Sequence, residues 1–364
     1  MAGRTAVNAA AANNPGRLNQ RISRWLCERR ICSGVARSYS AHEKVTAALL
    51  ATVIALAGAV IAANELLGVS NDRSQYDLFF SGLRNGERYY YGDTRFEAGF
   101  TYVATLLVNI GASNDVIYGV FVFIAFFPKL FIISLRSRRI AISAAVMVFY
   151  FTRFFPMFEL TILRSACAAG MLVLAFHFVE ERQIVKGLIF SALAIFFHNS
   201  ALIVAPLLFM PVIKLRYIIL LCIMLFALLT VYIDELLSHL IGSVESISYY
   251  QHGAQFLSAN LLAPSMSLDI ALLPIVIIFL YKHTFAMLRA LYMQMFATAF
   301  ALGAIKYSVF AFRLRDTIAI FLIFYLVDAL HDDDLRYPAM ALIALNSVIF
   351  TYAYFFYGSV HLLN

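Results

Sequence analysis

The run VIYGVFVFIAFFPKLFIISL at residues 116–135 is followed directly by Arg136-Ser137-Arg138-Arg139. About 20 mostly apolar residues are what a helix needs to cross the hydrocarbon core of a bilayer. A basic cluster at the end of such a run is typical of the cytoplasmic side. This stretch therefore predicts a transmembrane helix that ends in the cytoplasm.

The composition of the whole chain agrees with this reading of 116–135. Of its 364 residues, 62% are hydrophobic and 13% are charged, and the mean hydropathy is +0.80. Soluble globular chains are about half apolar and about a quarter charged. The 33 Phe and 20 Tyr suit a lipid-facing surface with aromatic rings at headgroup level. A soluble globular protein is therefore excluded.

Further apolar runs predict an all-α polytopic membrane protein with about ten to twelve membrane helices, because backbone polar groups in hydrocarbon must bond within helices. The run 187–213 holds His198 near its middle, which predicts two half-helices that turn at or near His198. The run 97–112 is short and starts with a charge, so we expect a partial, re-entrant helix. The predicted spans are 45–63, 97–112, 116–135, 140–158, 165–180, 187–213, 217–233, 268–281, 287–305, 315–330 and 337–358.

The distribution of basic residues predicts the domain organisation. Residues 1–44 are Arg-rich and predict a basic cytoplasmic tail, and 45–364 predict one transmembrane domain with outer-face loops 64–96 and 234–267. Basic loops that we expect in the cytoplasm are 180–186, 214–216, 282–289 and 331–336. The net charge of +7 then reflects topology, so we expect the bilayer, and no nucleic acid, as a partner.

The cysteines and histidines do not predict a metal site. Cys167 and Cys222 lie inside apolar runs, and no His stands at metal-ligand spacing from them. We expect reduced thiols, no metal and no cofactor.

This scheme places an unexpected set of arginines on the outer face, where the positive-inside tendency disfavours them. One interpretation is that they extend to headgroups or form structural ion pairs. The other is a polyanion at the outer leaflet, because Arg binds phosphate bidentately and stays charged when desolvated. The arginines are Arg73, Arg84, Arg88, Arg95, Arg153, Arg164, Arg313 and Arg315. Acidic residues at the same level are Asp72, Asp77, Glu87, Asp93, Glu97, Glu159 and Asp316.

Three further residues can carry proton chemistry. His198 interrupts an apolar run, where it either bonds a neighbouring carbonyl or marks a functional site. Asp72 and Glu97 can accept a proton from a sugar hydroxyl, or can serve as partners of Arg in a solvated loop. In the second outer loop, Tyr249 and Tyr250 can stack on sugars, but interfacial aromatic residues explain them equally well.

Five short motifs in order resemble the EpsG-like branch of the Wzy-type polysaccharide polymerases. They are Asp72-x-x-x-Tyr76, Glu97-x-Gly99-Phe100, Leu163-Arg164-Ser165-Ala166, the segment Phe197 to Leu202 (FHNSAL), and Phe312-Arg313. The likeness covers most of 64–330. The chain departs from the family pattern in Ser70-Asn71-Asp72, where Gly-Thr-Asp is usual, and in Leu163-Arg164-Ser165, where Leu-Arg-Gln is usual.

The resemblance implies polymerisation of polyprenyl-diphosphate-linked oligosaccharide repeat units at the outer face of the bacterial inner membrane, with a membrane fold like the C-type glycosyltransferases. Arg164 and Arg313, helped by Arg315, would stabilise the leaving diphosphate without a metal. Glu97 or Asp72 would orient or deprotonate the acceptor hydroxyl, and His198 is the alternative base or a phosphate donor. Tyr76, Asp316 and Arg153 complete the predicted substrate-binding set. A protein that regulates chain length is a candidate partner.

Three other functions remain open from the sequence. A membrane acyltransferase that modifies sugars would use His198 near an acyl donor. A transporter or flippase of lipid-linked sugars would need a route lined with Arg through the bilayer, whereas these arginines gather at one face. A transferase that adds single sugars from a lipid monophosphate would make products of a different length.

Overall fold

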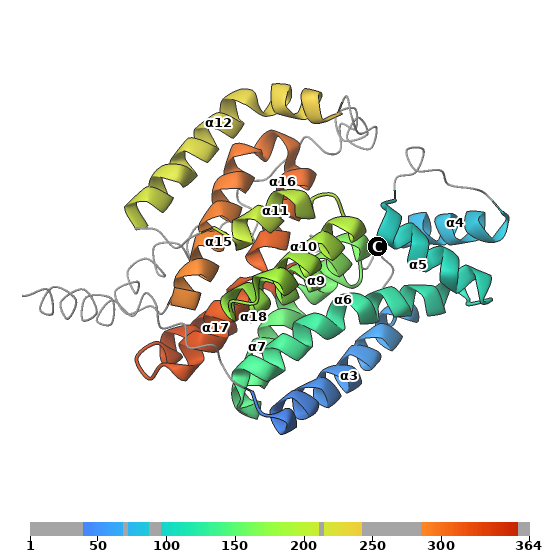
Figure 1. Cartoon of the computed structure of the whole chain (residues 1–364), viewed down its shortest axis with the longest axis horizontal. Coiled ribbons are helices and arrows are strands. Elements are labelled where there is room, and N and C mark those ends of the chain that lie inside the picture. Colours follow the sequence, from blue (N-terminus) through green and yellow to red (C-terminus); the bar gives the residue numbers. More distant parts are fainter. Residues whose placement is uncertain (1–38, 68–71, 87–95, 211–214, 242–284, 356–364) are drawn as a thin grey trace, which may run out of the picture. The chain divides into compact units, whose positions relative to one another are not determined.

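A computed structural model describes residues 39–67, 72–86, 96–210, 215–241 and 285–355 (Figure 1). All regular secondary structure within these ranges is helical, which confirms the all-α prediction. Some predicted features lie outside the described residues: most of the 1–44 tail, the span 268–281, most of the loop 234–267 with Tyr249 and Tyr250, and Glu87, Arg88, Asp93 and Arg95.

The described helices follow one another along the chain, and residues 242–284 between α12 and α15 lie outside the described residues. In order they are α3 (Ala41–Ala63), α4 (Arg73–Arg84), α5 (Ala98–Asn109), α6 (Asn114–Ser137), α7 (Ile140–Arg153), α8 (Phe155–Phe158), α9 (Leu163–Glu180), α10 (Ile184–Phe197), α11 (Ala201–Leu208), α12 (Leu215–Ile241), α15 (Phe285–Gly303), the 3₁₀ turn η3 (Ile305–Tyr307), α16 (Ser308–Ala319), α17 (Leu322–His331) and α18 (Arg336–Phe355).

Four of the described helices are long and apolar enough to cross a membrane: α3, α6, α9 and Arg216–Glu235 within α12. Shorter apolar helices are α5, α7 and α10. The chain is therefore a multi-pass membrane protein, as predicted. The count of ten to twelve membrane helices and the likeness to C-type glycosyltransferases stay predictions.

The predicted run 187–213 is broken at His198, as expected. The helix α10 ends at Phe197, and His198 has an extended backbone with φ −159° and ψ 124°. The chain then enters the short helix α11, which contains Pro206. The backbone of His198 therefore leaves the helical path at the point where an ionisable side chain interrupts the apolar run.

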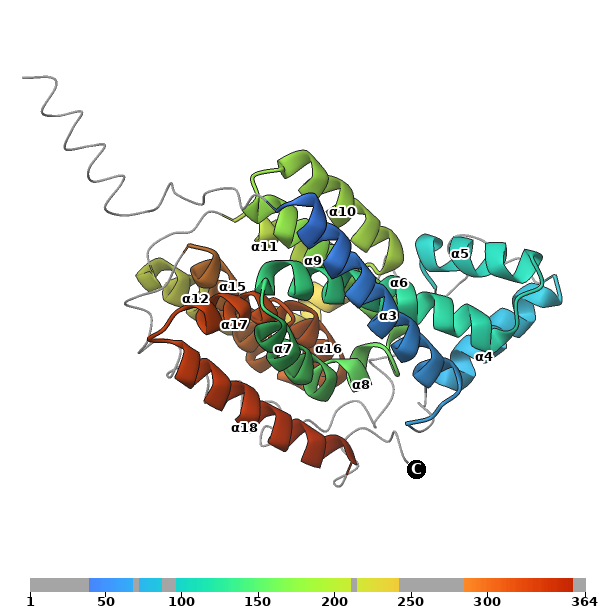
Figure 2. The same ribbon diagram turned by 90° about the horizontal axis from the view of Figure 1, so that it is seen from below.

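The helix α5 agrees with the expected partial helix at 97–112. Its 12 residues extend about 18 Å at 1.5 Å per residue, whereas the hydrocarbon core of a bilayer is about 30 Å thick. Figures 1 and 2 show α4 and α5 together beside the N-terminal end of α6. The chain therefore leaves α3 and enters α6 at the same end of the helical body.

Two predicted spans are interrupted in the structure. The span 140–158 is α7 followed by the separate turn α8, because Pro156 lacks the N–H that would continue the hydrogen bonds of α7. The span 315–330 is shared by α16 and α17, which separate at Ile320 and Phe321. Neither Pro nor Gly marks this second break in the sequence.

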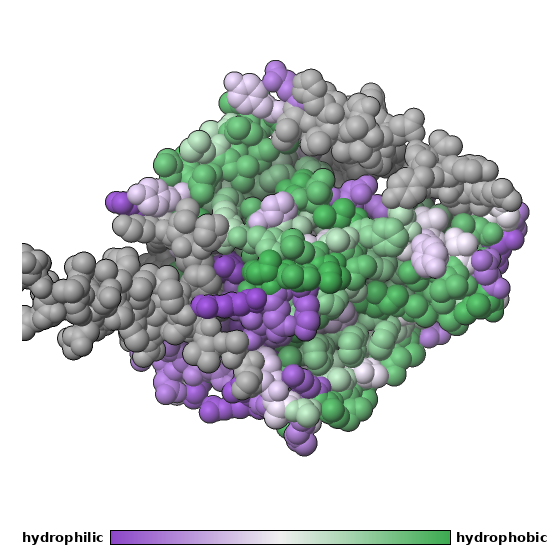
Figure 3. Space-filling view, in the orientation of Figure 1, coloured by the Kyte–Doolittle hydropathy of each residue, from purple (hydrophilic) through white to green (hydrophobic). Residues whose placement is uncertain are grey.

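Small residues and aromatic rings bring the central helices together. The helix α3 packs Ala51, Ala55 and Ala59 inward along α6, which is typical of membrane helix interfaces. A Cβ on Gly170 of α9 would lie 2.6 Å from the carbonyl oxygen of Ala125 on α6, so these backbones need a glycine to approach so closely. Figure 3 shows apolar residues across much of one face, with polar residues at its lower left and right edge.

A buried ion pair joins α6 to the segment between α7 and α9. Lys129 Nζ lies 2.6 Å from Glu159 Oε1, and both side chains are fully buried. The Tyr150 hydroxyl donates to the same oxygen at 2.8 Å. Glu159 was expected among the outer acidic residues, and no local feature of the sequence marks Lys129 as its partner.

Loss of one member of this pair should destabilise the fold. Lys129→Met would leave the Glu159 carboxylate buried without its cation, which costs about 3–5 kcal/mol of unfolding free energy. Lys129→Met combined with Glu159→Gln removes both charges and should recover most of that loss. The measurement is chemical unfolding of the purified protein in detergent micelles.

The matched control is Lys186→Met, because the Lys186 side chain is exposed on α10. It should lower the unfolding free energy by at most about 1 kcal/mol, because it removes only a contact with the ring of Phe178, 5.3 Å away. Equal stability of Lys129→Met and the doubly substituted protein would show that the loss does not come from a buried Glu159 carboxylate left without its cation.

Candidate active site

The starts of three helices and the end of a fourth meet beside α16. Arg164 is the second residue of α9, and His198 is the C-cap of α10. Glu97 is the N-cap of α5, and Asp72 is the N-cap of α4. Arg313 enters from α16, and Tyr76 lies one turn into α4. We call Asp72, Tyr76, Glu97, Arg164, His198 and Arg313 the motif cluster, because each belongs to one of the ordered motifs in the sequence.

Glu97 is the centre of the motif cluster. Its Oε2 accepts a hydrogen bond from Arg164 Nη1 at 2.8 Å, and its Oε1 lies 2.5 Å from His198 Nδ1. The backbone N–H of Asn199 donates to the same Oε1 at 3.4 Å. One carboxylate therefore connects α9, the break after α10 and α5. The bond to His198 uses Nδ1, so Nε2 is the ring nitrogen that can exchange a proton with a substrate.

The close approach of α5 to α10 gives Glu97 its position. A Cβ on Gly99 would lie 2.6 Å from the carbonyl oxygen of Phe196, in the last turn of α10. Only glycine allows the first turn of α5 to rest on this backbone. The spacing Glu97-x-Gly99 therefore has a physical reason: the glycine makes the contact that brings the carboxylate to His198.

Tyr76 and Arg313 extend the motif cluster along α4. Arg164 donates a side-chain hydrogen bond to Tyr76. Arg313 Nη2 pairs with Asp72 Oδ2 at 3.2 Å, and this pair is more open than the Glu97 centre, with side chains 29% and 32% exposed. Burial raises the pKa of Tyr76 to about 12, and the charges that also act on it are those of Arg164, Asp72 and Arg313. Tyr76 is therefore a neutral hydrogen-bonding group between the two Arg–carboxylate pairs.

Both oxygens of Glu97 are engaged, one by Arg164 and the other by His198 and the Asn199 N–H. A carboxylate paired with a guanidinium in this way orients its partners well but is a weak proton acceptor at neutral pH. The geometry therefore suits Glu97 better to orienting His198 and Arg164 than to taking a proton itself.

The structure does not bring all predicted substrate-binding residues into the motif cluster. Arg315 bonds to its neighbour Asp316 through Nη2 at 2.7 Å, and Arg153 Nη1 donates to Asn346 of α18 at 3.0 Å. The Arg153 and Arg315 side chains are almost fully buried. Of the two arginines on α16, Arg313 pairs with Asp72 in the motif cluster, and Arg315 pairs with Asp316.

Other outer-face arginines hold helices together. Arg73 is buried, bonds Asp115 Oδ1 at 2.5 Å, and lies 4.0 Å from the Tyr118 ring centroid. Arg84 donates to Asn114 and to the carbonyl of Ala112. Arg73 and Arg84 therefore both form structural pairs, which is one of the two interpretations that the sequence allowed.

Sequence analysis missed Phe96 as a site residue. Its ring centroid lies 4.9 Å from the Arg164 guanidinium carbon and 4.1 Å from the centroid of Phe79. Phe96 directly precedes Glu97, the partner of Arg164. Because aromatic rings often lie against a desolvated Arg, this position was a signal for a contact with Arg164.

Other ion pairs lie at the opposite end of the same helices. Arg136, near the end of α6, pairs with Asp328 at 3.3 Å, and Glu180, at the end of α9, pairs with Arg289 at 2.8 Å. Tyr118, near the start of α6, bonds the carbonyl of Leu160 just before α9, so α6 and α9 run in the same direction. The motif cluster and the basic segments 136–139 and 180–186 therefore lie at opposite ends.

Among the described side chains, no three His, Cys, Asp or Glu residues gather where they could hold a metal ion. Cys167 and Cys222 are buried and form no disulfide among the described residues. Independence from metals stays a prediction about the reaction.

A polytopic helical membrane protein with a cluster of Arg, carboxylate and His at one end of its bundle is the class that fold and site define. The sequence profile of the EpsG family matches residues 48–363, so the chain belongs to the EpsG family, a family of Wzy-type polysaccharide polymerase-like proteins. Comparisons with curated proteins and with solved structures found no match. Family membership confirms the resemblance and indicates a polymerase-like membrane protein of polysaccharide biosynthesis.

The role of Gly99 can be tested separately from the chemistry. Gly99→Ala should push the start of α5 away from Phe196 and separate Glu97 from His198, so polymer formation should fall by about tenfold or more. Gly111→Ala is the control, because a Cβ on Gly111 would meet no neighbouring atom within 4 Å. Its positive φ of +80° favours glycine, so the substitution adds some backbone strain. That control should lower thermal stability slightly and leave polymer formation near the original level. The measurements are polymer yield in cells and melting temperature in micelles.

Full polymer yield in the Gly99→Ala protein would show that the contact with Phe196 does not position Glu97.

Proposed function

We propose that this protein joins polyprenyl-diphosphate-linked oligosaccharide repeat units into a polysaccharide. The observation that carries the proposal is the motif cluster, in which two guanidinium groups, two carboxylates and one imidazole meet at one end of the bundle. Family membership supports a polymerase-like activity over the acyltransferase and flippase alternatives. The lipid diphosphate, the reaction and the roles of the residues below are parts of the proposal.

Transfer to a new acceptor requires a leaving group that accepts charge. As the anomeric carbon–oxygen bond breaks, negative charge grows on the diphosphate, and preorganised cations stabilise it most. Arg313 is best placed to receive a phosphate, because its pair with Asp72 is about one-third exposed and can be exchanged. Arg164 is fixed by Glu97, and a guanidinium has five N–H donors, so the bond to Glu97 does not use all of them.

His198 is the proposed base. The acceptor hydroxyl attacks the anomeric carbon and gives its proton to His198 Nε2, while Glu97 accepts a hydrogen bond from Nδ1 and stabilises the imidazolium. The new bond joins acceptor oxygen to the anomeric carbon, and the polyprenyl diphosphate leaves with the electron pair. Asp72 then belongs with Arg313 as its counter-ion, and Tyr76 donates a hydrogen bond to a phosphate or sugar oxygen.

Charge balance supports this use of the site. Within the motif cluster, two arginines face two carboxylates before substrate binds, so the half-buried guanidinium groups are compensated. An arriving diphosphate can replace the carboxylate of Asp72 on Arg313 without leaving a buried cation unpaired.

The proposal includes the location of the reaction. The basic segments at the opposite end favour the cytoplasm for that end, so the motif cluster faces the outer side of a bacterial inner membrane. The lipid-linked oligosaccharide and a chain-length regulator are its proposed partners. For the buried residues Arg153, Arg315 and Asp316 the structure favours support of α16 and α18 over direct substrate contact.

Deletion of the gene tests the proposed function. Surface polysaccharide should lose its ladder of lengths while a single repeat unit still reaches the surface. Complementation with the full-length chain should restore the ladder on a gel. A ladder that persists in the deletion strain, or lipid-linked units that accumulate only inside the cell, would contradict polymerisation.

Arg164→Lys tests recognition by the guanidinium. The change keeps the positive charge but removes the planar fork that binds two oxygens at once, so polymer formation should fall by about 10²-fold. Arg84→Lys, at an exposed position at the same end, is the matched control and should keep the full ladder. A normal ladder with Arg164→Lys would argue against bidentate binding of a diphosphate.

A further inference from the structure

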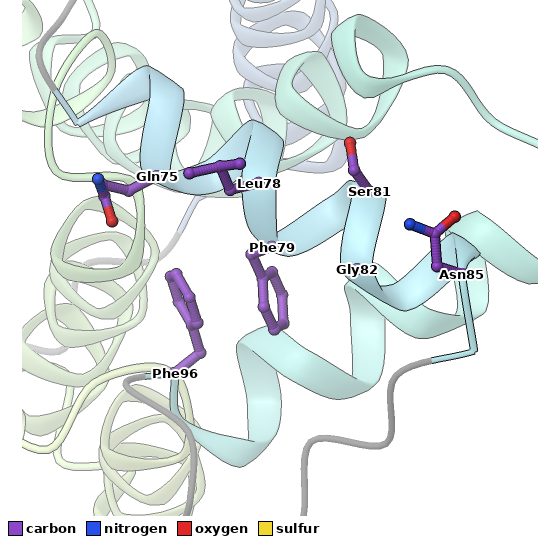
Figure 4. A pocket seen from close by; sticks show the side chains of 7 residues that line it. All are labelled: Gln75, Leu78, Phe79, Ser81, Gly82, Asn85 and Phe96. Carbon is purple, nitrogen blue, oxygen red and sulfur yellow. The ribbon is translucent and has the colours of Figure 1, made fainter.

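A pocket lies along α4, beside the motif cluster. Its volume is about 360 Å³, within the range of small-ligand sites. Figure 4 shows that α4 forms one side and that the ring of Phe96, before α5, lies next to the ring of Phe79. The lining residues are Gln75, Leu78, Phe79, Ser81, Gly82, Asn85 and Phe96.

The spacing of these residues gives α4 a second functional face. Gln75, Leu78, Gly82 and Asn85 recur every three or four positions, so they share one side of the helix. Tyr76 and Arg73 are buried on the other side, toward α6. One helix therefore supplies Asp72 and Tyr76 to the motif cluster and a row of uncharged groups to the pocket.

The chemistry of the lining fits a carbohydrate. Gln75 and Asn85 offer amide groups and Ser81 a hydroxyl, and each can both donate and accept hydrogen bonds, as sugar hydroxyls require. The rings of Phe79 and Phe96 provide an apolar wall against which the C–H face of a sugar can pack. None of the seven lining residues carries a charge, which disfavours a phosphate, and the three polar side chains disfavour an isoprenoid chain.

Phe96 connects the pocket with the motif cluster. One wall of the pocket is the same ring that lies 4.9 Å from the Arg164 guanidinium carbon. Gln75 directly precedes Tyr76, and its backbone N–H bonds the carbonyl of Asp72 at 3.1 Å. A sugar attached to a diphosphate at Arg164 and Arg313 would therefore have its neighbouring sugars beside α4. From Gln75 to Asn85 the helix rises about 15 Å, which gives room for more than one ring.

We propose that this pocket is a glycan-binding subsite, in which Gln75, Ser81 and Asn85 recognise uncharged sugars of the repeat unit that lie next to the reacting one. This inference rests on the proposed function for the identity of the glycan. It assigns selection of the repeat unit to α4, and binding of the diphosphate to the motif cluster.

The test uses the purified full-length protein in micelles and an oligosaccharide released from the producing cell's own surface polysaccharide, without lipid or diphosphate. Saturation-transfer NMR should show transfer from protein to sugar ring protons. Substitution of Gln75, Ser81 and Asn85 together by Ala should weaken binding about tenfold or more, because several hydrogen bonds are lost at once. Asn109→Ala, at an exposed position on α5 outside the pocket, should bind within about twofold of the original protein.

Arg164→Lys separates this inference from the proposed function. It should lower polymer formation by about 10²-fold and leave binding of the free oligosaccharide unchanged, because the diphosphate is absent from the probe. In an assay of polymerisation at varied concentrations of lipid-linked repeat units, the triple Ala variant should raise KM more than it lowers kcat. If the triple variant fails to fold, Gln75→Ala and Asn85→Ala alone, both at exposed positions, should each weaken binding about threefold.

Three results would overturn the subsite. They are no saturation transfer from the original protein, equal transfer from the triple Ala variant, or displacement of the oligosaccharide by polyprenyl phosphate that carries no sugar. Each can occur while the deletion strain still loses its ladder, so the subsite can fail while the proposed function stands.

Discussion

The architecture of the site depends on a single carboxylate, Glu97, that binds a guanidinium and an imidazole at the same time. An ionised group close to apolar helices is costly unless charges and hydrogen bonds compensate it. Arg164 and His198 do so, but each must come from a helix end, because a side chain in mid-helix would face lipid or packed neighbours. The break after α10 and the short α5 are therefore the backbone geometry that this carboxylate requires.

Packing outside the site fixes these helix ends. The segment that leads into Arg164 is held by Lys129, which pairs with Glu159, and by the Tyr118 hydroxyl, which bonds Leu160. Tyr118 in turn lies against Arg73 and Tyr76. Buried polar groups along α6 therefore hold the start of α9 in place, and aromatic ring contacts connect this region to α4.

Much of the fold could be predicted from sequence, because an apolar run as long as the bilayer is thick predicts a membrane helix. An ionisable residue inside such a run predicts a break in the helix. His198 and the short run 97–112 followed from that rule. The ordered motifs also identified residues that the structure brings together. Contacts between distant positions could not be predicted: Lys129 has no local signal for Glu159, and burial of Arg153 depends on Asn346 in α18. The break at Ile320 carries no sequence marker, since local bonding and tertiary packing decide it.

The pair of Asp72 with Arg313 joins residues 241 positions apart. A ribosome releases the chain from its N-terminus, so α4 reaches the membrane long before α16 is synthesised. Through that interval Asp72 has no Arg313 to meet, and a half-made chain lacks the second guanidinium of the cluster. Completion of the cluster by α16, one of the last helices, means that its full set of charges exists only when insertion is nearly finished.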